Sequence, residues 1–304
     1  MEFDHRIQYF LGSNSVRGFA SLYQNFCRPE TGGFLWVIKG GPGCGKSSFM
    51  KKIGAAAEKD GLNVQYVWCS GDPDSLDAVY VPARKIGYVD GTAPHVMEVP
   101  YPGAGGLYLD LGRFYDRKAL QPRLKEIMEL HARNQAIYTE AYDLLDQASV
   151  WKPHAVRTAK TAAPFSLPAK HGNGILARRF CRALTCRGML SFPLSDSSPE
   201  ILPASEDAEQ LAQSAAAAGY DVICAQHPIY PEMTEAVFLP ETGGYYAADL
   251  TELELRLLPL EKRVSEKLRQ AKSVHDELEA LYNPHVDFDG VYSLAADHIV
   301  GLKN

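Results

Sequence analysis

The first half of the chain places short apolar runs around an amphipathic stretch. Residues 34–38 (FLWVI) form a continuous apolar run, which predicts a strand buried on both faces. The stretch 49–58 has helical character and stops at Gly61, a favourable residue after a helix C-terminus. Further strands are predicted over 63–70 and 86–90. This order of elements predicts an α/β fold of three layers around a mostly parallel sheet.

Two long segments carry apolar residues at alternating spacings of three and four positions, the period of an amphipathic helix. One segment runs over 120–145 and the other over 264–282, and both are charged at their remaining positions. We expect the two helices to pair as a helical annex beside the sheet. Coiled-coil dimerisation is the alternative, but His131 and Asn134 interrupt the apolar seam of the first segment.

A glycine-rich segment connects the predicted strand 34–38 to the predicted helix. It matches the pattern G-x-x-x-x-G-K-S with one further serine, and its residues are Gly40, Gly41, Pro42, Gly43, Cys44, Gly45, Lys46, Ser47 and Ser48. Glycines allow successive backbone N–H groups to face one anion, and a helix beginning near Lys46 adds the positive end of its dipole. We expect Lys46 to contact the β- and γ-phosphates of a nucleoside triphosphate and Ser47 to bind Mg²⁺. A plain glycine-rich turn would require neither residue.

A second protein ligand for Mg²⁺ is expected at the end of a neighbouring strand. Asp90 ends the apolar run 86–89 and is followed by Gly91. Asp90 is therefore our candidate for the acidic residue that binds the metal, directly or through a water molecule. The alternative interpretation is an ordinary Asp-Gly turn that terminates a strand.

Two further carboxylates, Asp72 and Asp74, follow the predicted strand 63–70. Ligands bind at the carboxyl ends of the strands in open α/β sheets. Asp72 is therefore a catalytic candidate that would orient a water molecule or accept a proton from a substrate, and Asp74 could take the same role. A turn in which Asp-Pro caps the next segment explains both residues equally well.

The segments 61–82 and 219–240 are similar without gaps at a constant separation of 158 positions. The identical pairs are Gly61/Gly219, Val64/Val222, Pro73/Pro231, Ala78/Ala236, Val79/Val237 and Pro82/Pro240. We interpret this similarity as a duplicated unit, the alternative being chance similarity of two βα elements. The chain then divides into domains over 1–157 and 158–304.

The second copy lacks the residues of a phosphate loop. Its predicted strand 180–188 continues into MLSFPLSD without G-K-S, and Ala248 stands at the position of Asp90, with Asp249 one place later. We therefore expect the second copy to be non-catalytic. Four arginines near this segment are either solvated charges at a strand edge or a phosphate contact for the first copy. They are Arg178, Arg179, Arg182 and Arg187.

Residues 91–106 form a loop rich in glycine and proline, which the second copy lacks. A loop of this length in a compact domain is commonly a lid or a binding loop. His95 and Glu98 are its titratable residues and are candidates for acid or base catalysis, although either residue alone is more often without such a role.

Composition and charge restrict the setting in which the protein works. The chain has 304 residues, a net charge of −6 and no apolar run long enough to cross a membrane. Its N-terminal residues, MEFDHR, lack the basic and apolar regions of a signal peptide, so we expect a cytoplasmic protein. The acidic balance argues against non-specific binding of nucleic acid.

The segments GGPGCGKSSFMKKIG, CSGDPDSLDAVYVP and GYVDGTAPHV resemble a family of poorly characterised bacterial P-loop ATPases built from two tandem P-loop units. The resemblance covers most of residues 8–110 and is weaker through the second half, where that family often has its own phosphate loop. It implies a duplicated P-loop NTPase fold and nucleotide binding at Gly40–Ser47. Because this chain lacks the second loop, a mechanism with two active sites is not expected.

Three functions fit these residues. The first is Mg²⁺-dependent hydrolysis of ATP by a P-loop NTPase that moves the second copy or the helical annex and so acts on an unidentified partner. The second is a small-molecule kinase whose acceptor binds near the 91–106 loop and Asp72. The third is a nucleotide sensor without appreciable turnover. Phosphoryl transfer depends mainly on positioning and charge neutralisation, so the motifs do not separate these hypotheses.

Overall fold

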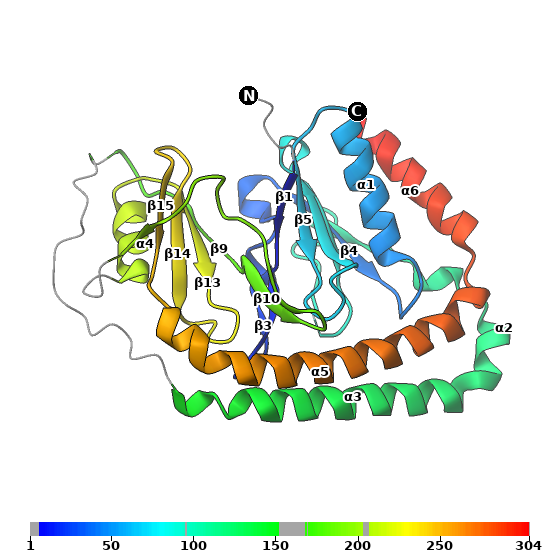
Figure 1. Ribbon diagram of the computed structural model, residues 1–304. Coiled ribbons are helices and arrows are strands. Elements are labelled where there is room, and N and C mark those ends of the chain that lie inside the picture. Colours follow the sequence, from blue (N-terminus) through cyan, green and yellow to red (C-terminus); the bar gives the residue numbers. More distant parts are fainter. Residues whose placement is uncertain (1–5, 95, 152–167, 169, 203–206, 304) are drawn as a thin grey trace.

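Two β-sheets lie side by side, and two long helices run beneath both of them (Figure 1). The computed structural model describes residues 6–94, 96–151, 168, 170–202 and 207–303. Each helix of this described part is too short or too polar to cross a lipid bilayer. The two sheets correspond to the two halves of the sequence, and the long helices connect them.

The first sheet contains the predicted parallel strands. Its order is β1 (Arg6–Tyr9), β5 (Val64–Trp68), β6 (Leu76–Val81), β7 (Ile86–Asp90), β4 (Phe34–Lys39) and β8 (Gly106–Asp110). The pairs β1–β5, β7–β4 and β4–β8 are parallel, whereas β6 is antiparallel to both of its neighbours. The predicted α/β class with parallel strands is thus confirmed. The carboxyl ends of β4 and β7 lie next to each other because Ile38 pairs with Asp90.

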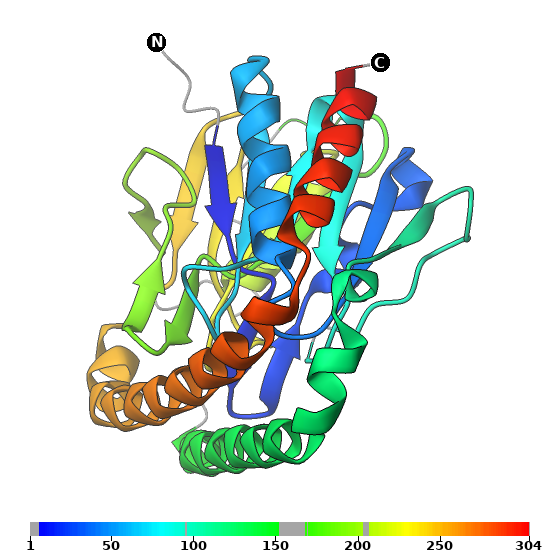
Figure 2. The same cartoon turned by 90° about the vertical axis from the view of Figure 1, so that its right-hand side faces the viewer.

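The two faces of the first sheet are covered differently. On one face lie α1 (Lys46–Lys59) and α6 (Phe288–Lys303), side by side (Figure 2). Their buried residues include Phe49, Ile53 and Val291, which pack in one cluster with residues of the sheet. The buried cluster on the other face takes its residues from strands, from irregular chain that includes Val99, and from the short 3₁₀ helix Tyr23–Asn25.

The expected helical third layer is therefore wrong for this face of the first sheet, as far as the described residues show. The connection from β7 to β8 crosses that face and carries prolines at 94, 100 and 102. Proline lacks the N–H of an α-helix and clashes with the preceding turn, so this connection crosses as irregular chain. Within the described residues, α-helices cover one side of the first sheet, and the other side is covered by irregular chain and one short 3₁₀ helix.

The second sheet repeats the strand order of the first. Its order is β9 (Leu176–Arg179), β13 (Val222–Gln226), β14 (Thr234–Leu239), β15 (Gly244–Ala247) and β12 (Glu200–Ile201). The successive pairs are parallel, antiparallel, antiparallel and parallel, as in β1–β5–β6–β7–β4. Helix α4 (Ala208–Ala217) packs on β13 and β14, as α1 packs on β5 and β6.

A hairpin follows the first strand of each half. The strands are β2 (Gly12–Ser15) with β3 (Gly18–Ser21), and β10 (Arg182–Thr185) with β11 (Gly188–Ser191). The predicted strand 180–188 is therefore only partly right, because Arg182–Thr185 is a strand but the chain turns back at residues 186–187. Apolar pattern alone does not distinguish a hairpin arm from a buried strand. The position of the missing phosphate loop moves to the connection between β12 and α4, of which residues 203–206 lie outside the described part.

The two halves meet through equivalent residues. The backbone N–H of Phe10 donates to the carbonyl of Phe180 at 2.8 Å, and the N–H of Phe180 donates back to Phe10 at 2.9 Å. Each phenylalanine follows the first strand of its half, β1 or β9. A reciprocal contact between equivalent positions is the pattern of a two-fold interface, here within one chain.

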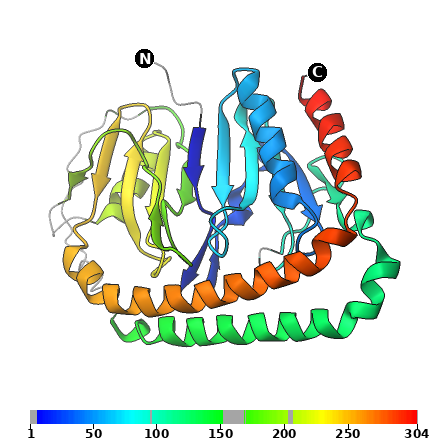
Figure 3. The ribbon, with the colours of Figure 1, turned by 45° about the vertical axis from the view of Figure 1, so that its right-hand side comes forward.

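The long helices are α3 (Leu124–Asp146), preceded by the short α2 (Arg117–Leu120), and α5 (Thr251–Tyr282). They pack along each other as an antiparallel pair, as predicted for the helical annex (Figure 3). Ile127 and Leu130 of α3 are buried against Val274 and Leu278 of α5. The annex is therefore held by apolar contacts within this chain.

The sequence division at 157 and 158 does not match the packing. Helix α5 begins beside the second sheet, ends beside the first and continues through a 3₁₀ turn (Asn283–His285) into α6 (Figure 1). Because α6 packs on α1, residues 288–303 belong to the core of the first sheet. The proposed boundary itself lies outside the described residues.

The buried side chain of His227 makes the stability of the protein depend on pH. It is buried after β13, and its Nδ1 accepts hydrogen bonds from the N–H groups of Ile229 and Tyr230, both at 3.2 Å. Burial, with the nearby charge of Arg182, lowers its pKa from 6.5 to about 3. The unfolded chain therefore binds a proton that the folded chain rejects between these pH values, and the free energy of unfolding falls as the pH falls.

We expect the wild type to lose about 2 kcal/mol more stability than His227→Asn between about pH 6.5 and about pH 5. The asparagine oxygen can accept the same two backbone hydrogen bonds without titrating. Urea unfolding of both proteins at the two pH values measures the difference, and carboxylates elsewhere in the chain act equally on both. Equal losses would assign the pH dependence to another group.

Candidate functional site

The segment Gly40–Gly45 turns tightly between β4 and α1. Gly43 and Gly45 have φ angles of +69° and +86°, in the left-handed region that favours glycine. Gly45 is also the N-cap of α1 and provides no side-chain cap. The N–H groups of the first turn of α1 are therefore available to an anion, and the helix dipole favours a negative charge there.

Neighbouring groups leave no room for side chains at two other glycines of this segment, Gly40 and Gly41. A Cβ atom added at Gly40 would lie 2.5 Å from Cys44 Sγ, and one at Gly41 would lie 2.9 Å from the hydroxyl of Tyr115. Cys44 itself is buried, and burial raises the pKa of its thiol. Packing therefore explains the glycines at positions 40 and 41, as the backbone angles explain those at 43 and 45.

Lys46 and Asp90, both candidate site residues, lie next to each other at the mouth of this loop. Lys46 Nζ donates to the carbonyls of Gly40 at 2.8 Å and Gly41 at 2.9 Å, and lies 3.6 Å from Asp90 Oδ2. Both side chains are largely enclosed, with exposed fractions of 13% and 14%. The ammonium group is thus held within reach of an anion bound by the loop.

Ser47 and Asp90 present oxygens of the kind that Mg²⁺ prefers. Ser47 Oγ accepts a hydrogen bond from Leu76 N at 3.0 Å. Asp90 Oδ1 accepts from the N–H of Thr92 at 2.9 Å and from its hydroxyl at 2.5 Å, which leaves Oδ2 directed to Lys46. One hydroxyl and one carboxylate, with phosphate and water oxygens, form a suitable ligand set for Mg²⁺. The donor set therefore fits the predicted metal.

Asp72 shapes the turn between β5 and β6. Its Oδ1 accepts from Asp74 N at 3.2 Å, and its Oδ2 accepts from Ser75 Oγ at 3.0 Å and lies 3.5 Å from Lys272 Nζ of α5. Asp74 forms an exposed ion pair with Arg187. These contacts support the turn interpretation, and a catalytic role for Asp72 stays a prediction.

The described residues of the 91–106 loop do not lie across Gly40–Gly45 as a lid. Lys39 Nζ donates to the carbonyls of Gly91 at 2.8 Å and Met97 at 3.0 Å, and Val99 is buried under the sheet. Glu98 is hydrogen-bonded to Tyr108 of β8. Because β7 and β8 are parallel, the chain must return along one face of the sheet, and the contacts of Met97 and Val99 follow this return. His95 lies outside the described residues.

Each of the four arginines has a partner away from the phosphate loop. Arg178 pairs with Glu209, Arg182 pairs with Glu235 at 2.6 Å and with Glu254 at 2.7 Å, and Arg179 stacks over the ring of Tyr9. Arg187 reaches the first half but pairs there with Asp74. The structural interpretation of these arginines is therefore supported, rather than a phosphate contact.

Three residues of the site are missed by the local motif. The hydroxyl of Tyr115 donates to the carbonyl of Pro42 at 2.7 Å. Asn283, with its amide oriented to donate, lies 3.0 Å from the carbonyl of Gly43, and Phe288 lies beside Gly45. These residues come from the segments after β8 and α5, so spacing near the loop carries no signal for them. Comparisons with protein-family models, curated proteins and solved structures found no match to this chain.

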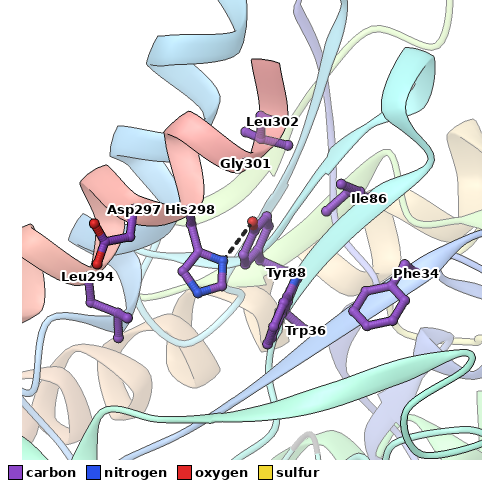
Figure 4. Close-up of a pocket in the computed structure, with 9 residues that line it drawn as sticks. All are labelled: Phe34, Trp36, Ile86, Tyr88, Leu294, Asp297, His298, Gly301 and Leu302. Carbon is purple, nitrogen blue, oxygen red and sulfur yellow. Dashed lines mark hydrogen bonds between the residues drawn. The ribbon is translucent and has the colours of Figure 1, made fainter. Parts of the chain in front are cut away.

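A separate groove of about 390 Å³ lies between α6 and strands β4 and β7 (Figure 4). His298 points from α6 toward Tyr88, and its Nδ1 lies 3.1 Å from the tyrosine hydroxyl. The ring of Trp36 contacts the same histidine edge to face, at 4.6 Å between centroids. The groove is lined by residues outside Gly40–Ser48, and we interpret its aromatic contacts as the packing that holds α6 on the sheet.

The second half offers an internal control for Asp90. Asp249 Oδ1 accepts from the N–H of Thr251 at 3.1 Å and from its hydroxyl at 2.7 Å, the same turn that Asp90 makes with Thr92. Asp249 precedes α5 and is exposed. We expect Asp249→Ala to leave ATP turnover unchanged in a steady-state ADP assay. A clear loss of turnover would show that the second half takes part in catalysis.

Proposed function

We propose that this protein is a P-loop NTPase that binds Mg²⁺-ATP at residues 40–48 and hydrolyses it, and that its second half is non-catalytic. The observation that carries the proposal is the convergence of four features at the carboxyl ends of β4 and β7. They are the glycine turn, Lys46 across its mouth, the Ser47 hydroxyl and the Asp90 carboxylate. This set matches the parts that phosphoryl transfer from a nucleotide requires.

The residues of the chain divide the work of binding and charge neutralisation. The backbone N–H groups of the loop and of the first turn of α1 would surround the β-phosphate. Lys46 would exchange the carbonyls of Gly40 and Gly41 for the β- and γ-phosphate oxygens, which are stronger acceptors because they are charged. Ser47 Oγ and Asp90 Oδ2 would hold Mg²⁺, which neutralises charge on the phosphates when bound.

The contacts of Asp90 orient it for this role. Thr92 uses Oδ1 twice, so the carboxylate cannot rotate without losing two hydrogen bonds, and Oδ2 stays near Lys46. Leu76 N similarly orients the lone pairs of Ser47 Oγ. Such preorganisation lowers the cost of reorganising the site when the nucleotide binds.

We propose further that the protein acts in the cytoplasm on an unidentified protein or small-molecule partner.

Calorimetric titration of the wild type with Mg²⁺-ATP, combined with an ADP assay without any acceptor, tests the proposal. We expect saturable binding and formation of ADP. ADP that forms only after a small-molecule acceptor is added would favour the kinase hypothesis. Binding without ADP under all conditions would favour a nucleotide sensor, and absence of binding would overturn the proposal.

A further inference from the structure

Two side chains from distant parts of the chain hold two backbone carbonyls of the glycine-rich turn Gly40–Gly45. The hydroxyl of Tyr115 donates to the carbonyl of Pro42 at 2.7 Å. The amide of Asn283, oriented to donate, lies 3.0 Å from the carbonyl of Gly43. Tyr115 follows β8 and Asn283 follows α5, so two separate segments reach adjacent peptide groups of the turn.

Glycines at two positions of the turn leave room for these side chains. A Cβ atom added at Gly41 would lie 2.9 Å from the hydroxyl of Tyr115. One added at Gly43 would lie 2.5 Å from the nearer terminal atom of the Asn283 amide. A larger residue at either position would therefore displace the side chain that holds the turn.

The segments that carry the two side chains are joined to each other. Residues 114–116 and 285–287 pair through two backbone hydrogen bonds, of 2.8 Å and 2.9 Å. The first segment contains Tyr115, and the second begins at the end of the 3₁₀ turn that Asn283 opens. The rings of Tyr115 and Tyr282 also pack together, at 5.1 Å between centroids. Both contacts with the glycine-rich turn therefore come from one hydrogen-bonded frame.

A carbonyl that is held in place also fixes the N–H group of the next residue. The peptide groups concerned are trans and planar, so their C=O and N–H bonds point in opposite directions. The contact at Pro42 thus turns the N–H of Gly43 away from Tyr115. The contact at Gly43 turns the N–H of Cys44 away from Asn283. Since glycine rotates freely about its backbone bonds, both peptide groups would turn over more easily without these contacts.

We propose that the two side chains are positioning residues that fix the N–H groups of Gly43 and Cys44 for the phosphates of a bound nucleotide. The proposal rests on the proposed function of Gly40–Ser48. Gly43 and Cys44 precede α1, so the geometry of the helix does not orient their N–H groups. An anion site whose donors are already oriented binds without the cost of ordering them.

Removal of the two donor groups tests this role. Tyr115→Phe removes the hydroxyl and keeps the ring, and Asn283→Ala removes the amide. We expect each variant to bind inorganic tripolyphosphate about fivefold more weakly than the wild type in calorimetric titration, the effect of one hydrogen bond. The matched control is Tyr282→Phe, which removes a hydroxyl from the ring packed on Tyr115 and leaves both contacts with the turn in place. Its affinity should equal that of the wild type.

The kinetics of ATP hydrolysis distinguish positioning from a general structural role. Groups that hold the nucleotide equally in the ground state and the transition state change KM and leave kcat unchanged. In the ADP assay, we therefore expect Tyr115→Phe to raise KM for Mg²⁺-ATP about fivefold and to keep kcat within about twofold of the wild type. A loss confined to kcat, or an equal loss of affinity in Tyr282→Phe, would overturn the positioning role.

The binding results separate this inference from the proposed function. Wild-type affinity in both Tyr115→Phe and Asn283→Ala, beside a wild type that binds, would overturn the positioning role and leave the function standing. Weaker binding of tripolyphosphate by the two variants, without formation of ADP by the wild type, would support the positioning role and overturn hydrolysis. Failure of the wild type to bind either tripolyphosphate or Mg²⁺-ATP would overturn both.

Discussion

Replacing Lys46 by alanine is expected to reduce ATP turnover by about 100-fold or more and to weaken the binding of Mg²⁺-ATP. Lys46 supplies the ammonium group at the mouth of the loop, where it donates to the carbonyls of Gly40 and Gly41 and lies 3.6 Å from Asp90. Alanine leaves the backbone turn intact but removes the positive charge that would meet the γ-phosphate. Steady-state ADP formation and calorimetric titration measure the two effects.

The matched control for Lys46→Ala is Lys59→Ala, which removes the same charge from the exposed far end of α1. Lys59 lies thirteen positions after Lys46 on the helix, or about 20 Å along the axis, so Lys59 should not influence the loop. Turnover by Lys46→Ala at the wild-type rate would place the reaction outside this loop. An equal loss in both variants would indicate a general effect of charge or folding.

Replacing Asp90 by asparagine is expected to spare most of the nucleotide binding and to lower the Mg²⁺-dependent turnover by about 100-fold. Asparagine keeps an oxygen that can accept the hydrogen bonds from Thr92, so the turn after β7 should persist. It loses the charge needed at Oδ2, both for the metal and beside Lys46. ADP formation measured over a range of Mg²⁺ concentrations should show that the variant no longer responds to the metal.

Asp249→Ala is the natural companion of Asp90→Asn, because Asp249 makes the same turn in the half without a phosphate loop. An unchanged Mg²⁺ response in Asp90→Asn would move the metal-binding acid elsewhere. Asp72 would be examined next, since it lies on the β5–β6 turn and Leu76, at the start of β6, donates to Ser47.

The candidate site was largely predictable because its main parts lie within one strand–loop–helix segment. Gly43 and Gly45 adopt conformations that other residues avoid, and Lys46 and Ser47 follow where the helix must begin. Asp90 was predictable for a different reason. A nucleotide site of the predicted kind needs an acidic metal ligand at the end of a neighbouring strand. The pairing of β7 with β4 places Asp90 in that position.

The second half was harder to place from sequence. Residues 61–82 and 219–240 align at a separation of 158, whereas the hairpins β2–β3 and β10–β11 lie 170 residues apart. The segment between them therefore differs in length, and the position of β12 followed only from its parallel pairing with β15. A strand of two residues carries no readable periodicity.

The sequence by itself determined the glycine-rich turn at Gly40–Gly45, the strand and helix around it, and the amphipathic character of the long helices. Only the tertiary structure showed that α5 crosses from one sheet to the other and brings the backbone of Glu279 and the side chain of Asn283 onto Gly43, with α6 packed beside α1. The physical reason is the range of the interactions. Backbone angles and capping act over a few residues and leave a local pattern, whereas helical periodicity shows which face of α5 is apolar but not which distant loop its polar end will touch.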